Sequence, residues 1–232
     1  MSMKDTMKDN TKQPISGYFL LEVLNKEGEV IEKIEQKNTI MDASKRSVAD
    51  SIRGISSDGA ENYADNFIST FAMGTKGTNP DGTIKYVDSS SNGMFCQQQT
   101  GSDVHDGDFM FIHFDKPSVY GVDTINGDDS TLLEVKFVDK VDGSLTDSSL
   151  TEYNVSIIST SQTKITYNIL IRNGGGNINA VTPYNECALY VQNKYDIGSA
   201  PVNLGNIFAS RTFALKNKDL DTSFRIKWTI VF

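Results

Sequence analysis

The residues able to carry acid–base or metal chemistry are few and far apart in this chain. Its two histidines, His105 and His113, are eight positions apart, a spacing that forms neither an HExxH helix nor a close pair of metal ligands. His113 lies between Ile112 and Phe114 in an apolar run, where a structural role is expected. We therefore expect neither histidine to be catalytic.

Acidic residues gather at two places that could supply oxygen ligands to calcium. One segment contains Asp103, Asp106 and Asp108. The other contains Asp123, Asn126, Asp128 and Asp129. Neither follows the Asp-x-Asp-x-Asp-Gly order of a twelve-residue calcium loop, so solvated turns are the favoured interpretation and the second segment stays a calcium candidate. No other metal and no cofactor is expected.

The two cysteines, Cys96 and Cys187, are far apart and belong to no CxxC pattern. This arrangement predicts neither a disulfide framework nor a zinc site. Two free thiols in a reducing compartment are expected.

Motifs of nucleophilic catalysis and of phosphate binding are absent from the sequence. There is no Gly-x-Ser-x-Gly elbow, and no glycine cluster leads from a strand into a helix with a lysine. The run Asn173-Gly174-Gly175-Gly176-Asn177 is typical of a turn. A glycosidase with paired carboxylates stays open, because its two acids can come from anywhere in the chain. The protein is expected not to be an enzyme.

The charge of the chain is unevenly distributed along its 232 residues, and the net value is −8. Residues 54–171 hold six Lys/Arg against seventeen Asp/Glu, whereas residues 172–232 hold seven against four. An acidic middle repels phosphate backbones, so a nucleic-acid partner is not expected. With 38% hydrophobic residues the composition is globular, and this length suits one all-β domain with an arm.

No apolar run approaches the roughly 18 residues needed to cross a bilayer, and residues 1–10 are polar. We therefore expect neither a membrane partner nor a secretory signal.

Residues 1–16 form a predicted N-terminal arm, and residues 17–232 a single domain. Met3, Met7, Pro14 and Ile15 are the arm's candidate assembly residues. The rest of the arm is too polar to pack on its own. A neighbouring subunit is expected to hold it.

The first elements of the domain are a hairpin and a helix. Tyr18–Asn25 and Val30–Ile34 are β-rich runs separated by a turn. Ile40, Val48 and further apolar residues share one helical stripe before Gly54, which predicts a helix over residues 40–53. Thr39 precedes this stretch and can cap its N-terminus.

The remainder of the chain predicts short strands. Candidates are Phe67–Met73, Phe109–Phe114, Leu132–Val138, Tyr153–Ser159, Lys164–Ile171, Glu186–Val191, Ile207–Ala214 and Ser223–Val231. The fold class is thus mainly β, a β-sandwich or jelly-roll-like domain with one short N-terminal helix and an extended arm.

Aromatic and aliphatic residues near the C-terminus alternate with polar ones, which places large apolar side chains on one face of a strand. The predicted core residues are Phe208, Phe213, Phe224, Ile226, Trp228, Ile230 and Phe232. Gly74 and Glu186 are expected at strand edges.

Five segments, taken in order, resemble a broad group of tailed-bacteriophage virion structural proteins. They are Lys37-Asn38-Thr39-Ile40, Ala72-Met73-Gly74-Thr75, Glu186-Cys187-Ala188-Leu189-Tyr190, Ile207 to Phe213, and Ile226 to Phe232. Members of the group run as "KN-x-I", "a-x-GtG", "EaGLf", "lfAR-x-f" and "l-x-v-x-WtI-x-F". In this chain "GTK" and "ECALY" replace the glycine-bearing versions, and residues 78–185 match no pattern of the group.

The resemblance implies a non-enzymatic component of a phage particle, made in the cytoplasm of the host bacterium and present in many copies at the tail, baseplate or neck. Its expected partners are other virion proteins and further copies of itself. Two alternatives stay open. One is a capsid decoration protein or a fibre module that binds a receptor or a carbohydrate; the other is a carbohydrate-active enzyme on the same scaffold.

Overall fold

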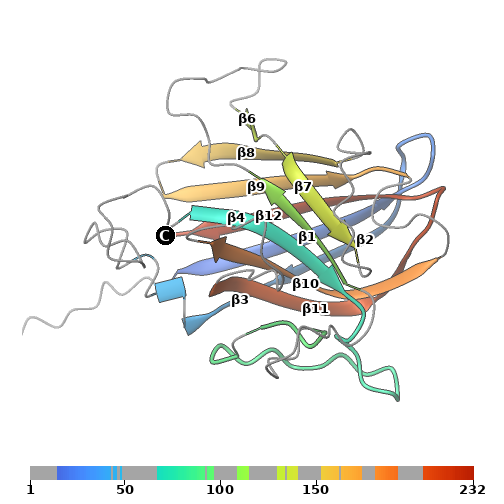
Figure 1. Cartoon of the computed structure of the whole chain (residues 1–232), viewed down its shortest axis with the longest axis horizontal. Helices are drawn as coiled ribbons and strands as arrows, with labels where there is room; N and C mark the ends of the chain where they lie inside the picture. The colour runs from blue at the N-terminus through green and yellow to red at the C-terminus, as the bar shows by residue number, and fades with distance from the viewer. Residues whose placement is uncertain are drawn as a thin grey trace, which may run out of the picture.

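The computed structural model has two antiparallel sheets, whose strands hold most of the residues that the structure describes (Figure 1). The structure describes residues 15–42, 44–45, 48, 67–91, 93–96, 109–114, 130–133, 135–140, 153–161, 163–173, 181–192 and 206–232. Within these residues no helix has the length and apolar character needed to cross a membrane. The expectation of a mainly β chain is confirmed.

The first sheet, called sheet A, has the strand order β2-β1-β12-β9-β8-β6. Its strands are β1 (Ser16–Leu24), β2 (Val30–Lys37), β6 (Ser130–Leu133), β8 (Tyr153–Ser161), β9 (Lys164–Ile171) and β12 (Ser223–Val231). The C-terminal strand β12 lies between β1 and β9, and its alternating pattern places one face on the core along its whole length.

The second sheet, called sheet B, has the order β3-β11-β10-β4-β5-β7. Its strands are β3 (Thr39–Ile40), β4 (Phe67–Gly74), β5 (Phe109–Phe114), β7 (Val135–Lys140), β10 (Thr182–Gln192) and β11 (Asn206–Lys218). Two bulges interrupt the pairing of β10 with β11, one at Tyr184/Glu186 and one at Leu189/Tyr190.

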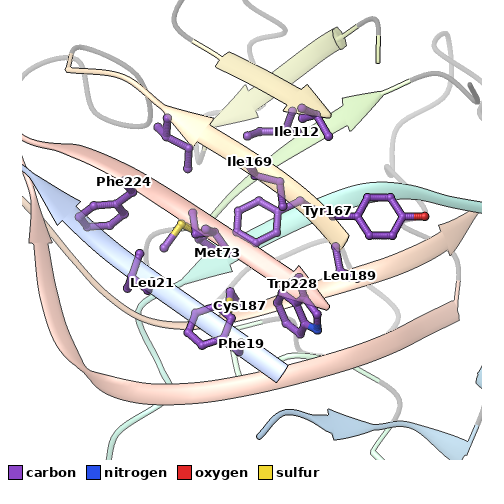
Figure 2. Packing of buried hydrophobic residues seen from close by; sticks show 14 of the residues in the cluster. Phe19, Leu21, Met73, Ile112, Tyr167, Ile169, Cys187, Leu189, Phe224 and Trp228 are labelled. Carbon is purple, nitrogen blue, oxygen red and sulfur yellow. The ribbon is translucent and has the colours of Figure 1, made fainter. Parts of the chain in front are cut away.

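The main core lies between the two sheets (Figure 2). Phe19 and Trp228 of sheet A meet Phe213 and Phe71 of sheet B, with ring centroids 5.6 Å apart for Phe19–Phe213 and 6.5 Å for Phe71–Trp228. Such offset and edge-on contacts are the preferred geometries of aromatic pairs. The sheets are therefore joined face to face by large apolar side chains.

The two sheets differ in how far the faces that point away from the main core are buried. Strand β12 alternates between buried and half-buried residues, whereas every residue from Ile68 to Gly74 in β4 is buried. A strand covered on both faces buries residues of both faces, and in β4 these include the polar Ser69 and Thr70 as well as apolar residues. A second cluster of buried residues explains this cover. It consists of Met41, Ala72, Val87, Met94, Cys96, Phe111, Ala188, Tyr190 and Ile207.

The cover of sheet B is supplied by residues 75–91 and 93–96, called here the 75–96 segment. It follows β4 and lies beside β11 at the bottom of Figure 1. Val87, Met94 and Cys96 contribute its buried side chains. This segment has little regular structure, yet it forms one wall of a core.

The predicted helix over residues 40–53 is not shown, and its start is wrong. Thr39 and Ile40 form β3, which pairs with Ser210 and Ala209 of β11. The Met41 amide then donates to the Phe208 carbonyl, so β11 holds the chain extended where a helix cap was expected. Asp42, Ser44, Lys45 and Val48 have helical backbone, and the other residues of 43–53 lie outside the described residues.

Two further expectations differ from the structure. The predicted strand Leu132–Val138 is divided, because Ser130–Leu133 pairs with β8 of sheet A and Val135–Lys140 pairs with β5 of sheet B. Phe232, predicted in the core, is 40% exposed; it follows the last residue of β12, and its amide donates to the Thr163 carbonyl. The other six predicted core residues are buried.

The predicted N-terminal arm falls mostly on residues 1–14, and Met3, Met7 and Pro14 lie outside the described residues. Ile15 is partly buried against the main core, and Ser16 is the first residue of β1.

Candidate functional site

His113 has a neighbour that accounts for its position. Its Nδ1 lies 3.1 Å from the Thr70 hydroxyl, and the two residues face each other across β4 and β5. This is a cross-strand pair within sheet B. His105 and the calcium candidates Asp123, Asn126, Asp128 and Asp129 lie outside the described residues.

Across the described part of the chain, no group of three or more His, Cys, Asp or Glu side chains is placed to hold a metal ion. Cys96 and Cys187 are free and buried. Burial raises the pKa of the Cys187 thiol well above its usual value, and the neighbouring Glu186 raises it further. A thiol with a raised pKa is a poor nucleophile at neutral pH.

Glu186 is the most unusual polar group that the structure describes. It lies within β10 and is fully buried, although its position was expected to be a strand edge. Its carboxylate accepts three backbone hydrogen bonds, from the amides of Lys76 (3.1 Å) and Cys96 (2.9 Å) to Oε1 and from that of Phe95 (2.7 Å) to Oε2. These donors belong to the two ends of the 75–96 segment, so one side chain fastens both.

The protonation of Glu186 reflects two opposing effects. Burial raises the pKa of its carboxyl group, because the charged form loses its hydration. Hydrogen bonds from Phe95, Cys96 and Lys76 lower the pKa and offset part of this increase. Burial of the Glu186 carboxylate costs hydration free energy, and the three amide hydrogen bonds replace much of the lost hydration, as a buried acid requires.

Asn185, the preceding residue, holds the same segment a little further along. Its Oδ1 accepts from the Gly77 amide at 2.6 Å, and its Nδ2 donates to the Thr75 carbonyl and to the Thr78 hydroxyl. The bulge at Tyr184/Glu186 lies at this residue. A bulge redirects a side chain, and here consecutive residues both reach the 75–96 segment.

Two glycines make this close approach possible. A Cβ on Gly74 would lie 2.2 Å from the Cys96 sulfur and 2.9 Å from Oε1 of Glu186. A Cβ on Gly77 would lie 2.2 Å from the Asn185 carbonyl oxygen. Only glycine allows the backbone to pass so near to β10. Gly74 ends β4 directly opposite Glu186, and its lack of a side chain leaves room for the Glu186 carboxylate.

The opposite side of the 75–96 segment carries apolar groups toward solvent. The ring of Tyr86 is 84% exposed, and Ile84 and Phe95 are also exposed. The Lys85 ammonium lies over the Phe95 ring, 4.9 Å from its centroid. We call these four residues the Tyr86 surface. The Thr212 hydroxyl donates to the Lys85 carbonyl, which ties this surface to β11.

The hydrogen bonds of Asn185 and Glu186 hold the 75–96 segment on sheet B and leave the Tyr86 surface exposed to solvent. The acceptor capacity of Glu186 is used by backbone amides, and the irregular chain above it is held at several points. Rigidly supported irregular segments are where proteins commonly place their contacts with other molecules.

Sequence reasoning missed the pairing of Asn185 and Glu186 with the 75–96 segment. A signal was present, because Asn185-Glu186 interrupts an otherwise apolar strand, and a buried acid must find donors. The sequence does not say where the donors are, since they lie 90 to 110 positions away.

The fold and this site define a mainly β protein with two packed sheets, one of which is covered by an irregular segment that side chains of β10 hold in place. Neither the known protein families, nor the curated proteins, nor the solved structures include a match to this chain.

Proposed function

We propose that this chain is a non-enzymatic structural component of a tailed-bacteriophage particle, present in many copies at the tail, baseplate or neck. In this proposal it is a β-sandwich with a short N-terminal helix and an arm that precedes Ile15 and reaches a neighbouring subunit. It is made in the cytoplasm of the host bacterium and ends in the virion. Its partners are other virion proteins and its own copies, and neither nucleic acid nor a membrane.

The observation that supports the proposal is spatial. The segments that carry the resemblance are neighbours in the fold, although they are spread over the sequence from Lys37 to Phe232. Ile40 pairs with Ala209, and Glu186 pairs with both Gly74 and Thr212. Four of the five segments thus adjoin in sheet B, and the fifth is β12 across the core.

An assembled particle gives a reason for this combination. A well-packed scaffold with a fastened surface segment can present the same contact in every copy. Weak contacts become strong when many copies and an arm raise the local concentration of partner sites.

A second candidate is a capsid decoration protein or a fibre module that binds a receptor or a carbohydrate. The Tyr86 surface favours it, because an exposed tyrosine ring offers a flat apolar face on which a sugar can stack. Trp228 cannot do so, since it is fully buried. Loss of glycan binding in Tyr86→Ala, with an unchanged melting temperature, would favour this candidate.

The test of the main proposal is to find the chain in particles. An antibody raised against the purified protein is used on tailed particles isolated by density gradient from lysates of the bacterium that carries the gene. Labelling of the tail, baseplate or neck in electron micrographs is the expected result. Labelling of the capsid surface or of fibre tips would support the second candidate, and particles free of the chain would overturn both.

A further inference from the structure

Strand β2 is an edge of sheet A, and it is unusually long and exposed for an edge. Among the described residues it pairs only with β1. Six of its eight residues are exposed, and Ile31 is 54% exposed. An edge strand presents unpaired amides and carbonyls that can pair with another strand.

The ladder with β1 shows which backbone groups of β2 are free. The Asn38 amide donates to the Gly17 carbonyl, and this pair follows Tyr18↔Lys37 in the ladder. In antiparallel pairing, hydrogen-bonded and non-hydrogen-bonded pairs alternate. Ile34 and Gln36 therefore point their amides and carbonyls at β1, while Lys33, Glu35 and Lys37 point theirs outward.

This alternation restricts how a second β2 can pair with the first. In such a dimer, residues whose backbone groups point away from β1 must pair with residues of the same kind in the second copy. These residues occur at every second position, so the twofold axis that relates the two strands passes through a residue position and not between two positions. A bulge between Val23 and Leu24 ends the regular part of the ladder at Glu32. The available axes lie on residues 32–37.

The charges distinguish these axes. An axis on Ile34 places Lys33 opposite Glu35 of the second copy, twice, with Ile34 beside its own counterpart. It also places Glu32 opposite Gln36, whose amide can donate to a carboxylate. An axis on Lys33 would face two lysines, and an axis on Glu35 would face two glutamates. Axes nearer the ends leave most of the strand unpaired. Opposite charges across strands stabilise a sheet and like charges destabilise it.

We propose that two copies of this chain join by antiparallel pairing of their β2 strands about an axis on Ile34, which makes one sheet out of the two copies of sheet A. The partner is a second copy because β2 is self-complementary in this register. In the single chain Lys33 and Glu35 already bind each other, with Nζ and Oε2 3.1 Å apart. On pairing, each of them exchanges this neighbour for the opposite charge in the second copy.

Lysines on an edge strand often serve to prevent pairing. Here the registers about Glu32, Lys33, Glu35 and Lys37 each bring like charges face to face. The register about Gln36 also places Glu35 opposite Lys37, but it pairs only residues 35–37 of β2. The charges therefore oppose most registers, and the register about Ile34 is the one that combines opposite charges with pairing along most of the strand. The inference gives the multi-copy part of the proposed function a specific contact, but it rests on the structure alone.

The first experiment measures the mass of the full-length chain in solution over a range of concentrations. We expect a species with twice the chain mass of 25.6 kDa. Lys33→Glu faces Glu35 of the second copy with a like charge, and it is expected to weaken dimerisation at least about tenfold. Lys33→Glu combined with Glu35→Lys restores opposite charges and is expected to restore the dimer. Lys227→Glu, on the same face but within β12, makes the same change in charge and is expected to leave dimerisation unchanged.

The second experiment tests the axis. Ile34→Cys places two thiols next to each other in the dimer, within reach of a disulfide, and mild oxidation is expected to cross-link the copies. Ile31→Cys is the control, since its two copies would lie roughly 20 Å apart although the side chain is more exposed. The native cysteines are buried and do not compete.

A chain that stays monomeric at its highest soluble concentration would overturn the proposal. So would a dimer that tolerates Lys33→Glu, or a cross-link that forms as well at Ile31 as at Ile34. Circular dichroism establishes that each variant is folded. None of these outcomes bears on whether the chain is present in phage particles, so the two proposals fail separately.

Discussion

Trp228 links the two sheets through its ring contacts. It is fully buried in β12, with its ring edge-on to Phe19 of the same sheet at 5.2 Å and to Phe71 of sheet B at 6.5 Å. Its indole N–H is buried and has no hydrogen-bond partner among the described residues. The value of Trp228 therefore lies in its size and shape and not in its polar atom.

Trp228→Ala is expected to lower the free energy of unfolding by about 3–5 kcal/mol, as removal of a large aromatic from a core does. Trp228→Phe is expected to cost clearly less, because it keeps a ring and removes an unsatisfied donor. Lys227→Ala, on the opposite face, is expected to change stability by no more than about 0.5 kcal/mol. Urea unfolding of the four proteins gives the comparison. A larger loss in Lys227→Ala than in Trp228→Ala would contradict this account of the core.

Glu186 makes the stability of the protein depend on pH in a defined direction. Burial raises the pKa of its carboxyl group above the ordinary value of 4.5, so the folded protein binds this proton more tightly than the unfolded chain does. The contribution of Glu186 to stability is then fully present below pH 4.5 and is lost as pH rises through the pKa of the folded state.

Glu186→Gln removes this titration. The free energy of unfolding, measured by urea from about pH 4 upward, is expected to fall with pH more steeply in the wild-type protein than in Glu186→Gln. The reverse order would mean that the three amide hydrogen bonds outweigh burial and lower the pKa.

At the scale of elements, the 75–96 segment behaves as a third layer on sheet B. Val87, Met94 and Cys96 pack on the strands, and Asn185 and Glu186 hold the backbone. Most of its stability must come from these tertiary contacts, because it has little regular hydrogen bonding of its own.

Gly77→Ala is expected to loosen this layer. Its Cβ would lie 2.2 Å from the Asn185 carbonyl oxygen, and backbone atoms cannot move aside easily. A loss of about 1–3 kcal/mol is expected, as for other overpacked positions. Hydrogen exchange should locate the change in residues 75–96. Ile84→Ala, at an exposed position of the same segment, is the control and should leave the free energy of unfolding and the hydrogen exchange nearly unchanged. Equal effects of the two substitutions would show that the close approach at Gly77 does not hold the segment.

At the scale of the whole molecule, the described fold begins at Ile15, and the proposed arm is the stretch that precedes it. Ile15 packs on the main core, and β1 starts at Ser16, so a deletion that spares both removes none of the described residues.

Deletion of residues 1–14 is therefore expected to leave the melting temperature nearly unchanged and to abolish incorporation into particles. Thermal unfolding and quantification of the chain in purified particles test the two parts. Loss of folding would show that the arm belongs to the domain, and normal incorporation would show that assembly does not use it.

Much of the secondary structure could be predicted from the sequence because strand formation leaves a local signal. The alternation from Phe224 to Ile230 repeats every two residues, and it identified both the strand and its buried face. The hairpin of β1 and β2 was visible from two β-rich runs on either side of a turn. The predictions were wrong at the limits of elements: the alternation extends to Phe232 although the strand ends before it, and Thr39 and Ile40 belong to a strand and not to a helix start.

Only the tertiary structure decided which strands are neighbours and what Glu186 does. The run from Leu132 to Val138 is rich in strand-forming residues, and the charged Glu134 and Lys136 within it do not reveal that it is divided between two sheets. Glu186 and the amides that it binds are about a hundred positions apart. Local preferences depend on residues within a few positions, whereas strand order and the partners of a buried acid depend on contacts that exist only once the chain has folded.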